Sequence, residues 1–303
     1  MKYSGNPILS PGDAADWDFC LAGTISVLRD PQDVNAPFKM WYVGGEVPDG
    51  EGAAIGYATS LDGLTWTKYQ ANPVMRPGSW WDTRGFSGIS VIQDGPGYKL
   101  WYEGKDWDRT FRIGLATSPD GIHWEPHLGN PVLSIGYGNA WDNDDVGNPC
   151  VIQEDATYRM WYWGDSIGSG IDQIGLAVSE NGISWQRAGT EPVIAPNDCI
   201  WWENGEGVGT PCVAKRASGY AIAYHAADQA GVVRVGFATS PDGVEWNKKP
   251  EALLALGDDG SWDNLGMFPA ELMEDGTHLK LWYVGIDPDE TVRVGLATFR
   301  DAP

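Results

Sequence analysis

A segment of about sixty residues occurs five times in this 303-residue chain, and this repeat constrains the fold more than any other feature. Its clearest part is a Trp-Tyr pair, in FKMWYVG from Phe38, YKLWYEG from Tyr98, YRMWYWG from Tyr158 and LKLWYVG from Leu279, with a weaker copy, YAIAYHA, from Tyr220. The tyrosines of the five copies are 60, 60, 62 and 59 residues apart. Self-similarity at such a period indicates a repeat architecture.

Each repeat predicts four β-strands. A short apolar stretch such as TISVL or GISVI precedes the Trp-Tyr segment, and a run such as IGLATS from Ile113 follows it. An Asp-Gly or Asn-Gly turn then leads to a segment with a tryptophan, as in PDGIHW ending at Trp124. Such turns join antiparallel strands, and no helical period interrupts the pattern. Four strands repeated five times predict an all-β fold, a five-bladed β-propeller that fills residues 1–303 as a single domain.

The two ends of the chain complement each other. After the last third strand, near Thr298, no fourth strand follows. At the other end, KYSGNPIL from Lys2 matches KYQANPVM from Lys68, which ends a fourth strand. We therefore expect the N-terminal segment to join the last blade and close the ring, because closure removes an exposed sheet edge.

Composition excludes some classes of partner. With 20 Lys+Arg against 42 Asp+Glu, the net charge is -22, so we expect no nucleic acid and no anionic membrane as partner. No stretch approaches the roughly 18 apolar residues of a membrane helix. We see no signal peptide, which predicts a cytoplasmic protein, or a secreted one if a signal peptide has been cleaved. The four cysteines form no CxxC pair and are expected to be buried free thiols.

The repeat also separates scaffold from site, because residues shared by all blades hold the blades together. Thirteen of the seventeen tryptophans fall at repeated positions and are predicted to pack between blades. The acids that follow one set of these tryptophans are predicted to be turn or capping groups. They are Asp18, Asp82, Asp142 and Asp263.

Two columns of equivalent residues differ between blades instead. One precedes the first strand and holds Cys20, Arg84, Asp144, Glu206 and Leu265; the other follows the Trp-Tyr pair and holds Val43, Glu103, Trp163, His225 and Val284. Both columns concentrate polar residues in blades two to four. We predict one lopsided pocket at the propeller mouth, to which the loop KDWDRT adds two residues. Its lining is Arg84, Glu103, Asp144, Asp145, Trp163, Glu206 and His225, with Trp107 and Arg109 from the loop.

Strand alternation points two further rings of residues toward the axis. The outer ring is Thr24, Gly88, Asn148, Thr210 and Pro269, and the deeper ring is Ser26, Ser90, Cys150, Cys212 and Glu271. Glu271 is the one charged residue in the deeper ring. A lone carboxylate there needs a partner, a proton or an ion.

The WYxG, IGLATSxDGxxW and NPVL motifs together resemble the five-bladed propeller glycosidases over essentially the whole chain. That superfamily includes glycoside hydrolase family 43, the family 32 invertases and levanases, and the family 130 mannoside phosphorylases. The resemblance implies acids on the inner strands of the first three blades. By position these fall at Thr24, Gly88 and Asn148, none of which is a carboxylate.

The resemblance implies a glycosidase that acts on oligosaccharides, and the varied columns offer other acids. Glycoside cleavage needs one carboxylic acid and one carboxylate. We expect an inverting exo-glycosidase with Asp144, Glu206 and Glu103 as catalytic acids. The predicted substrate-binding residues are Arg84, Trp107, Arg109, Asp145, Trp163 and His225. The alternatives are a glycoside phosphorylase and a catalytically silent carbohydrate-binding propeller.

Two expectations concern binding groups other than acids. Trp80, Trp107, Trp163 and Trp201 lie in or beside loops of one face, where they either stack on sugar rings or pack beneath the loops. No cofactor is required for the predicted chemistry. A structural calcium or sodium ion near Glu271 at the axis is a further expectation, since some relatives carry a central ion.

Overall fold

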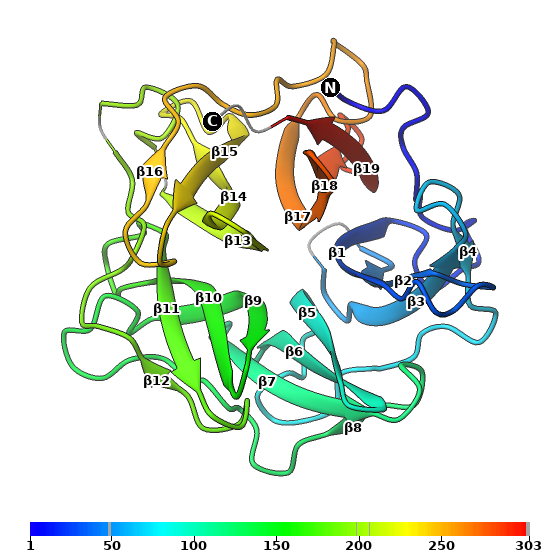
Figure 1. The fold of residues 1–303 in the computed structure, drawn as a ribbon, viewed down its shortest axis with the longest axis horizontal. Coiled ribbons are helices and arrows are strands. Elements are labelled where there is room, and N and C mark those ends of the chain that lie inside the picture. The colour runs from blue at the N-terminus through cyan, green and yellow to red at the C-terminus, as the bar shows by residue number, and fades with distance from the viewer. Residues whose placement is uncertain (48–49, 198, 206, 301–303) are drawn as a thin grey trace.

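The computed structural model describes residues 1–47, 50–197, 199–205 and 207–300. These residues form an all-β, five-bladed β-propeller whose blades surround a central axis (Figure 1). The predicted fold class is thereby confirmed. The described residues contain no helix, and hence none long and apolar enough to cross a membrane.

Blades 1 to 4 each run from an inner strand beside the axis to a short outer strand, and blade 5 has three strands. Blades 1 and 2 consist of β1 Leu21–Arg29, β2 Phe38–Gly45, β3 Ala54–Ser60, β4 Thr67–Lys68, β5 Phe86–Asp94, β6 Gly97–Lys105, β7 Phe111–Ser118 and β8 Glu125–Pro126. Blades 3 and 4 consist of β9 Asp145–Glu154, β10 Thr157–Asp165, β11 Gln173–Ser179, β12 Gln186–Arg187, β13 Val208–Arg216, β14 Gly219–Ala227, β15 Val233–Ser240 and β16 Asn247–Lys248. Blade 5 contains β17 Gly266–Asp275, β18 His278–Ile286 and β19 Val292–Phe299.

The N-terminal segment completes blade 5. Lys2 and Leu9 form antiparallel bridges with Ala297 and Val294 of β19. The Asn6 side chain accepts from the backbone N–H of Leu296 and donates to its carbonyl, as a peptide group would. The asparagines of the repeated NPV motif, Asn72 and Asn130, make the same pair of bonds in blades 1 and 2. The N-terminal segment therefore bridges to β19 at the place where the last repeat lacks its fourth strand.

The repeated tryptophans join neighbouring blades. The indole N–H of Trp41 in blade 1 donates to the carbonyl of Gly121 in blade 2 at 2.7 Å, and its ring meets the edge of Trp124. The same contacts link blade 2 to blade 3 and blade 3 to blade 4, through Trp101 and Trp161. These fully buried rings account for much of the apolar area that stabilises the ring of blades.

The acids after the repeated tryptophans also belong to the scaffold. In blade 3, the buried carboxylate of Asp142 accepts from the hydroxyl of Tyr162 at 2.9 Å and pairs with Arg187 at 2.6 Å. Equivalent sets of tyrosine, acid and cation are Tyr42, Asp18 and Lys68; Tyr224, Glu203 and Lys248; and Tyr283, Asp263 and Lys2. This agrees with the prediction that these acids are structural.

Every inner strand has a β-bulge at the same level, and the bulges define the mouth of the axial channel. The pairing between the inner strand and the second strand of blade 1 shifts in register between Gly23 and Ile25 of β1. The pairing shifts at the equivalent point in each of the other four blades. Three residues at the bulges have positive φ, namely Thr24, Asn148 and Thr210 at 27°, 41° and 42°. Non-glycine residues rarely adopt this region, and such strain concentrates at functional sites.

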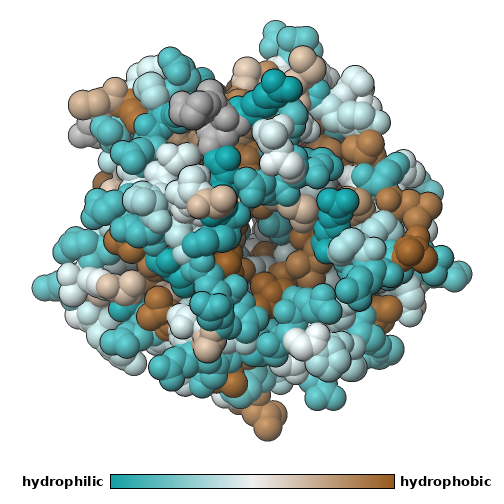
Figure 2. All heavy atoms as spheres, in the orientation of Figure 1, coloured by the Kyte–Doolittle hydropathy of each residue, from teal (hydrophilic) through white to brown (hydrophobic). Residues whose placement is uncertain are grey.

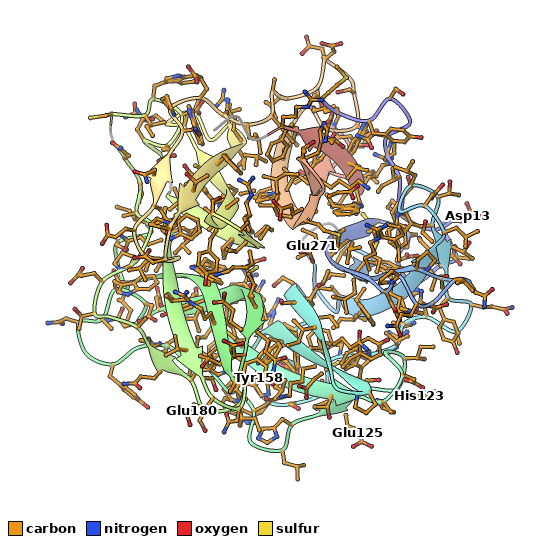
Figure 3. All side chains as sticks on the ribbon, viewed as in Figure 1. Asp13, His123, Glu125, Tyr158, Glu180 and Glu271 are labelled. Carbon is orange, nitrogen blue, oxygen red and sulfur yellow. The ribbon has the colours of Figure 1, made fainter. Side chains whose placement is uncertain are left out.

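The view down the axis separates the channel from the rim. The face is hollowed at its centre, with hydrophobic residues among the hydrophilic ones around the hollow (Figure 2). Glu271 lies beside the channel, whereas Glu125 of β8 and His123 and Glu180, beside the Asp-Gly and Asn-Gly turns, lie at the periphery (Figure 3). The charged residue near the axis is therefore well separated from the exposed charged residues of the rim.

Candidate active site at the mouth of the channel

Glu103 is the most buried of the predicted site residues. It lies on β6 with 2% of its surface exposed and accepts hydrogen bonds at both oxygens. Ser87 donates to Oε1, while the backbone N–H of Asn148, its side-chain amide and the indole N–H of Trp163 donate to Oε2 at 2.6, 3.0 and 3.2 Å. Burial raises the pKa of Glu103, and these donors partly offset that effect. Glu103 therefore ties blade 2 to blade 3 and holds Asn148 in its strained conformation.

Three aspartates gather at the start of β9, above Glu103. Asp145 pairs with Asp165 across β9 and β10, and the N–H of Asp144 donates to the carbonyl of Asp165. Burial raises the pKa of Asp145 to about 7, and the charges of Asp165, Asp144 and Glu103 add to the increase. The N–H of Phe111, which donates to Asp145 at 2.7 Å, opposes it only in part. Asp145 is half-buried, and with this raised pKa a substantial fraction of its carboxyl groups keeps the proton near pH 7, as a general acid requires.

Asp165 shares this environment. Burial raises its pKa, as does the charge of Asp144, and its Oδ1 atom is buried without a hydrogen-bond partner in the protein. A buried, unpaired carboxylate oxygen is costly unless a proton or a ligand satisfies it. The sequence analysis did not single out Asp165. Its signal was available, since blades 1, 2, 4 and 5 carry Gly45, Lys105, Ala227 and Ile286 at the equivalent position.

Three of the other four blades have a paired acid and arginine at the mouth, whereas blade 3 has Ser166 at the position of that acid. In blade 2, Asp106 pairs with Arg112 at 2.5 Å, and in blade 4, Asp228 pairs with Arg234 at 2.7 Å. Blade 5 contains the same pair, Asp287 and Arg293. Blade 3 instead has Gln173 at the arginine position. Among the described residues, no salt bridge reaches Asp144, Asp145 or Asp165, so the acidic charge of the mouth is concentrated in blade 3.

Arg84, Trp107 and Arg109 lie on the blade 2 side of this cluster. Arg84 donates to Glu51 through Nε at 2.9 Å and Nη2 at 2.5 Å, and its guanidinium lies 5.6 Å from the ring centre of Trp107. The Trp107 side chain is exposed, as is Arg109, which has a φ of 67°. Because Arg84 is paired with the carboxylate of Glu51, its positive charge is already balanced.

His225 forms a separate group in blade 4. Its Nδ1 lies 2.7 Å from the hydroxyl of Thr210, its Nε2 lies 3.9 Å from Asp172, and its ring packs against Phe268. Burial lowers the pKa of His225 to about 4, so the imidazole is neutral at pH 7. His225 thus orients Thr210, a strained residue that lines the channel.

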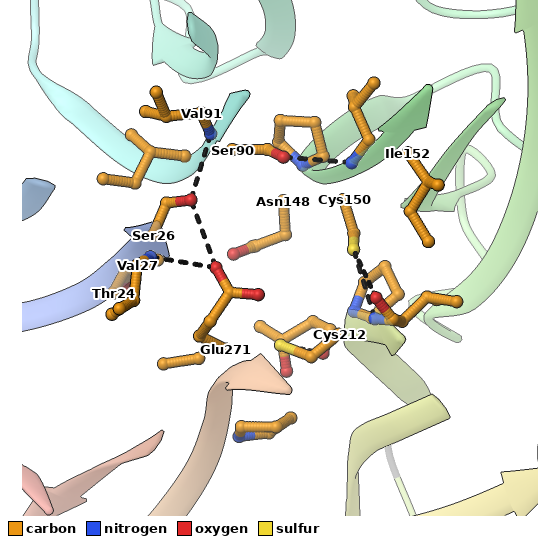
Figure 4. A pocket seen from close by; sticks show the side chains of 18 of the residues that line it. Thr24, Ser26, Val27, Ser90, Val91, Asn148, Cys150, Ile152, Cys212 and Glu271 are labelled. Atoms are coloured by element: carbon orange, nitrogen blue, oxygen red, sulfur yellow. Dashed lines mark hydrogen bonds between the residues drawn. The ribbon is translucent and has the colours of Figure 1, made fainter. Parts of the chain in front are cut away.

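Below the mouth, the axial channel encloses a cavity of about 150 Å³ (Figure 4). The deeper ring links neighbouring blades here, because four of its five residues accept a backbone N–H from the next blade. Ser26, Ser90 and Cys150 accept from Val91, Val151 and Val213, and Glu271 accepts from Val27 at 3.0 Å. Ser26 also donates to Glu271 at 3.1 Å.

Glu271 therefore closes the ring between blades 5 and 1, and these two donors are the partner that the sequence analysis required for it. Burial raises its pKa to about 7. In the described part of the chain, no three His, Cys, Asp or Glu side chains are grouped to hold a metal ion. Cys150 and Cys212 line the same cavity as free thiols.

The structure thus brings together Glu103, Asp144, Asp145 and Trp163 of the predicted pocket, with Arg84 and Trp107 on one side and His225 on the other. Glu206 lies outside the described residues, so its predicted role stays a prediction. Of the inner-strand positions that the glycosidase resemblance indicates, Thr24 and Asn148 line the channel. The four tryptophans outside the repeated positions have two kinds of environment. Trp163 packs beneath the mouth against Phe111, whereas Trp80, Trp107 and Trp201 are exposed.

Comparison with known proteins supports the fold. No family model matches the chain. A protein of Mycobacterium tuberculosis (strain CDC 1551 / Oshkosh) without a characterised function is 29% identical over 223 residues, which cover 70% of this chain and 69% of that protein. A 1,2-beta-oligomannan phosphorylase of Thermoanaerobacter sp. (strain X514) is 23% identical over 299 residues, or 94% of this chain and 93% of that enzyme.

Solved structures share the architecture along the whole chain. The beta-1,2-mannobiose phosphorylase of Listeria innocua, in complex with beta-1,2-mannobiose, superposes with a TM-score of 0.73 and 15% identity, covering 99% of this chain and 96% of that one. A structure from the GH130 family of mannoside phosphorylases, which contains glycoside hydrolases that target beta-1,2 mannosidic linkages, has a TM-score of 0.75 and 16% identity, covering 100% and 95%. Of the families that the sequence resembles, family 130 is therefore represented among these structures.

Proposed function

We propose that this protein is a glycoside hydrolase that cleaves oligosaccharides at the blade 3 side of the channel mouth, with Asp145 as the general acid. The observation that carries the proposal is the half-buried carboxyl of Asp145, whose pKa is raised to about 7 beside two further aspartates without a cationic partner in the described residues. A general acid with a pKa near the working pH donates its proton efficiently to a leaving oxygen.

Asp144 takes the second role in this proposal. It is half-buried at the same mouth and would activate the water that attacks the anomeric carbon. Asp145 protonates the departing oxygen, the bond from carbon to that oxygen breaks, and water supplies the new hydroxyl while its proton passes to Asp144. This retains the expectation of an inverting exo-glycosidase, in which the first-formed sugar has the opposite anomeric configuration.

Glu103 receives a positioning role rather than a catalytic one. All its hydrogen bonds are made within the protein, and almost none of its surface is open to a substrate. It holds Asn148 and Trp163 in place beneath the aspartates. Its negative charge also contributes to the raised pKa of Asp145.

The substrates to test first are β-mannosides, since three of the named relatives are described as acting on β-1,2-linked mannose. Two of these relatives are phosphorylases, which makes phosphorolysis the second candidate reaction. Phosphate binding needs cationic donors. Arg84, Arg112, Arg234 and Arg293 at the mouth each already pair with a carboxylate, and Arg109, for which the described residues provide no such pair, is a single exposed loop residue. We therefore favour water over phosphate as the acceptor.

The test is to incubate the protein with β-1,2-mannobiose, longer β-mannosides and a panel of other plant and microbial oligosaccharides, with and without phosphate. Release of free sugar at a rate independent of phosphate supports hydrolysis. Formation of a sugar 1-phosphate, only when phosphate is added, would replace it by phosphorolysis. Binding of oligosaccharides without any product would leave a silent carbohydrate-binding propeller.

A further inference from the structure

A three-residue module in blade 2 presents an indole ring to solvent. Arg112 pairs through Nη1 with Asp106 at 2.5 Å, and its guanidinium lies 5.6 Å from the ring centre of Trp80. Asp106 is buried, and its other oxygen accepts the N–H groups of Asp108 and Thr110 at 2.9 and 3.0 Å. The arginine is therefore held rigidly by a fixed carboxylate, and the indole has a fixed support on one side.

Blade 4 contains a second copy of the module. Arg234 pairs with Asp228 at 2.7 Å, and its guanidinium lies 4.9 Å from the ring centre of Trp201. Asp228 accepts the N–H groups of residues two and four positions further on, as Asp106 does. Blade 5 has the same pair of acid and arginine, Asp287 and Arg293, but no tryptophan in front of it. The acid–arginine pair therefore forms without the indole.

The two indoles are not needed by the scaffold. Trp80 and Trp201 directly precede the repeated tryptophan of their blades, where blades 1, 3 and 5 have Asp16, Ala140 and Ser261. They are 66% and 65% exposed, so burial does not explain them. An indole that is supported on one face and open on the other offers a flat, preorganised surface for stacking.

The charges of the modules indicate which ligand fits. Each arginine is balanced by its aspartate, so the module offers no net positive charge to an anion. The chain as a whole carries -22, which disfavours phosphorylated or acidic partners. A neutral ring with an apolar C–H face is the ligand that an open indole binds best under these conditions. Pyranose rings have such faces.

The modules also flank the proposed catalytic aspartates. Arg112 follows Phe111, whose N–H donates to Asp145. On the other side, Arg234 pairs across the sheet with Ala226, next to His225. Blade 3 and its acidic cluster stand between blades 2 and 4 in the ring (Figure 1).

We propose that Trp80 and Trp201 are two outer stacking platforms for sugar rings of an extended neutral oligosaccharide, one on each side of the blade 3 cluster. This inference rests on the proposed function for its substrate class. It implies that the preferred ligand is longer than a disaccharide, because the platforms contribute only to chains that reach beyond the acids.

The experiment measures binding by calorimetry in the Asp145→Asn background, which removes turnover. The probes are β-1,2-linked mannobiose and mannohexaose, with xylo-, arabino- and galacto-hexasaccharides as further probes. We expect Trp80→Ala and Trp201→Ala each to weaken binding of the preferred hexasaccharide about three- to tenfold, the range of an aromatic stacking contact. Binding of the disaccharide changes less than twofold.

Two controls separate stacking from folding. Trp80→Phe and Trp201→Phe retain a flat ring and restore most of the affinity, while Leu128→Ala, at a fully exposed apolar residue elsewhere, leaves it unchanged. Hexasaccharide affinity unaltered by the alanine variants, or no hexasaccharide bound at all, overturns the inference. Tryptophan-dependent binding by a protein that produces no product supports the platforms and refutes the hydrolase instead.

Discussion

Replacing Glu271 by glutamine tests whether the carboxylate at the axis is held in a site that disfavours its charge. Glu271 accepts from Ser26 and from the N–H of Val27, and glutamine retains an acceptor for both. Burial raises the pKa of Glu271 from 4.5 to about 7. The difference corresponds to about 3 kcal/mol of folding free energy, because one pKa unit is worth about 1.4 kcal/mol.

The sign follows from proton binding. Between pH 4.5 and 7 the unfolded chain has released the proton of Glu271 while the folded protein still holds it, so stability falls as pH rises. Below pH 4.5 this contribution is fully present, and above pH 7 it is lost. Glu271→Gln does not titrate, so the variant gains about 3 kcal/mol relative to the wild type between pH 4.5 and 8.

Urea unfolding of both proteins at pH 4.5, 6 and 8 measures this change. Taking the difference between wild type and variant cancels the pH effects of the other 41 acidic residues, since only one of the 42 is altered. A difference that stays constant with pH would refute the raised pKa. If the unfolding free energy of the variant, relative to the wild type, decreases toward high pH, the predicted direction of the pKa shift is wrong.

Three other predictions use the same reasoning. Because Asp145 acts in its protonated form, kcat/KM on an oligosaccharide falls as pH rises through about 7, and a profile flat to pH 9 contradicts the assignment. Arg187→Ala leaves the buried carboxylate of Asp142 without its cation and costs about 3–5 kcal/mol in urea unfolding, against no measurable loss for the exposed Lys249→Ala. Burial lowers the pKa of His225, so between pH 6.5 and 4 the unfolded chain binds a proton there that the folded protein does not. The wild type therefore loses stability relative to His225→Asn over this pH range, and equal acid sensitivity of the two proteins in unfolding experiments argues against the lowered pKa.

The fold was predictable from sequence because each blade repeats the same local devices. The Asn-Pro-Val segment supplies an amide that replaces a peptide group, and the Trp-Tyr pair supplies one interblade indole and one buried hydroxyl. The match between the segments starting at Lys2 and Lys68 was enough to predict closure, since Lys2 and Lys68 occupy equivalent ion pairs.

The site was only partly predictable. Comparing blades predicted Glu103, Asp144 and Trp163, with Asp145 beside them, because a scaffold has no use for different charges at one position. It did not show that Glu103 is enclosed by donors from its own and the next blade, since Ser87 and Asn148 approach it only through the bulges of β5 and β9. Nor did it find Asp165, whose Oδ1 atom is buried without a hydrogen-bond partner only because of how β9 and β10 pack.

The most direct test of the central claim compares two substrates of Asp145→Asn. A general acid is needed when the leaving group is a sugar alcohol and hardly needed when it is dinitrophenolate, which leaves without a proton. We predict a loss in kcat of about 10²- to 10⁴-fold on the preferred oligosaccharide and of less than about tenfold on the dinitrophenyl glycoside of the same sugar. Equal losses on both substrates, or full activity on the oligosaccharide, would contradict Asp145 as the acid and with it the proposed active site.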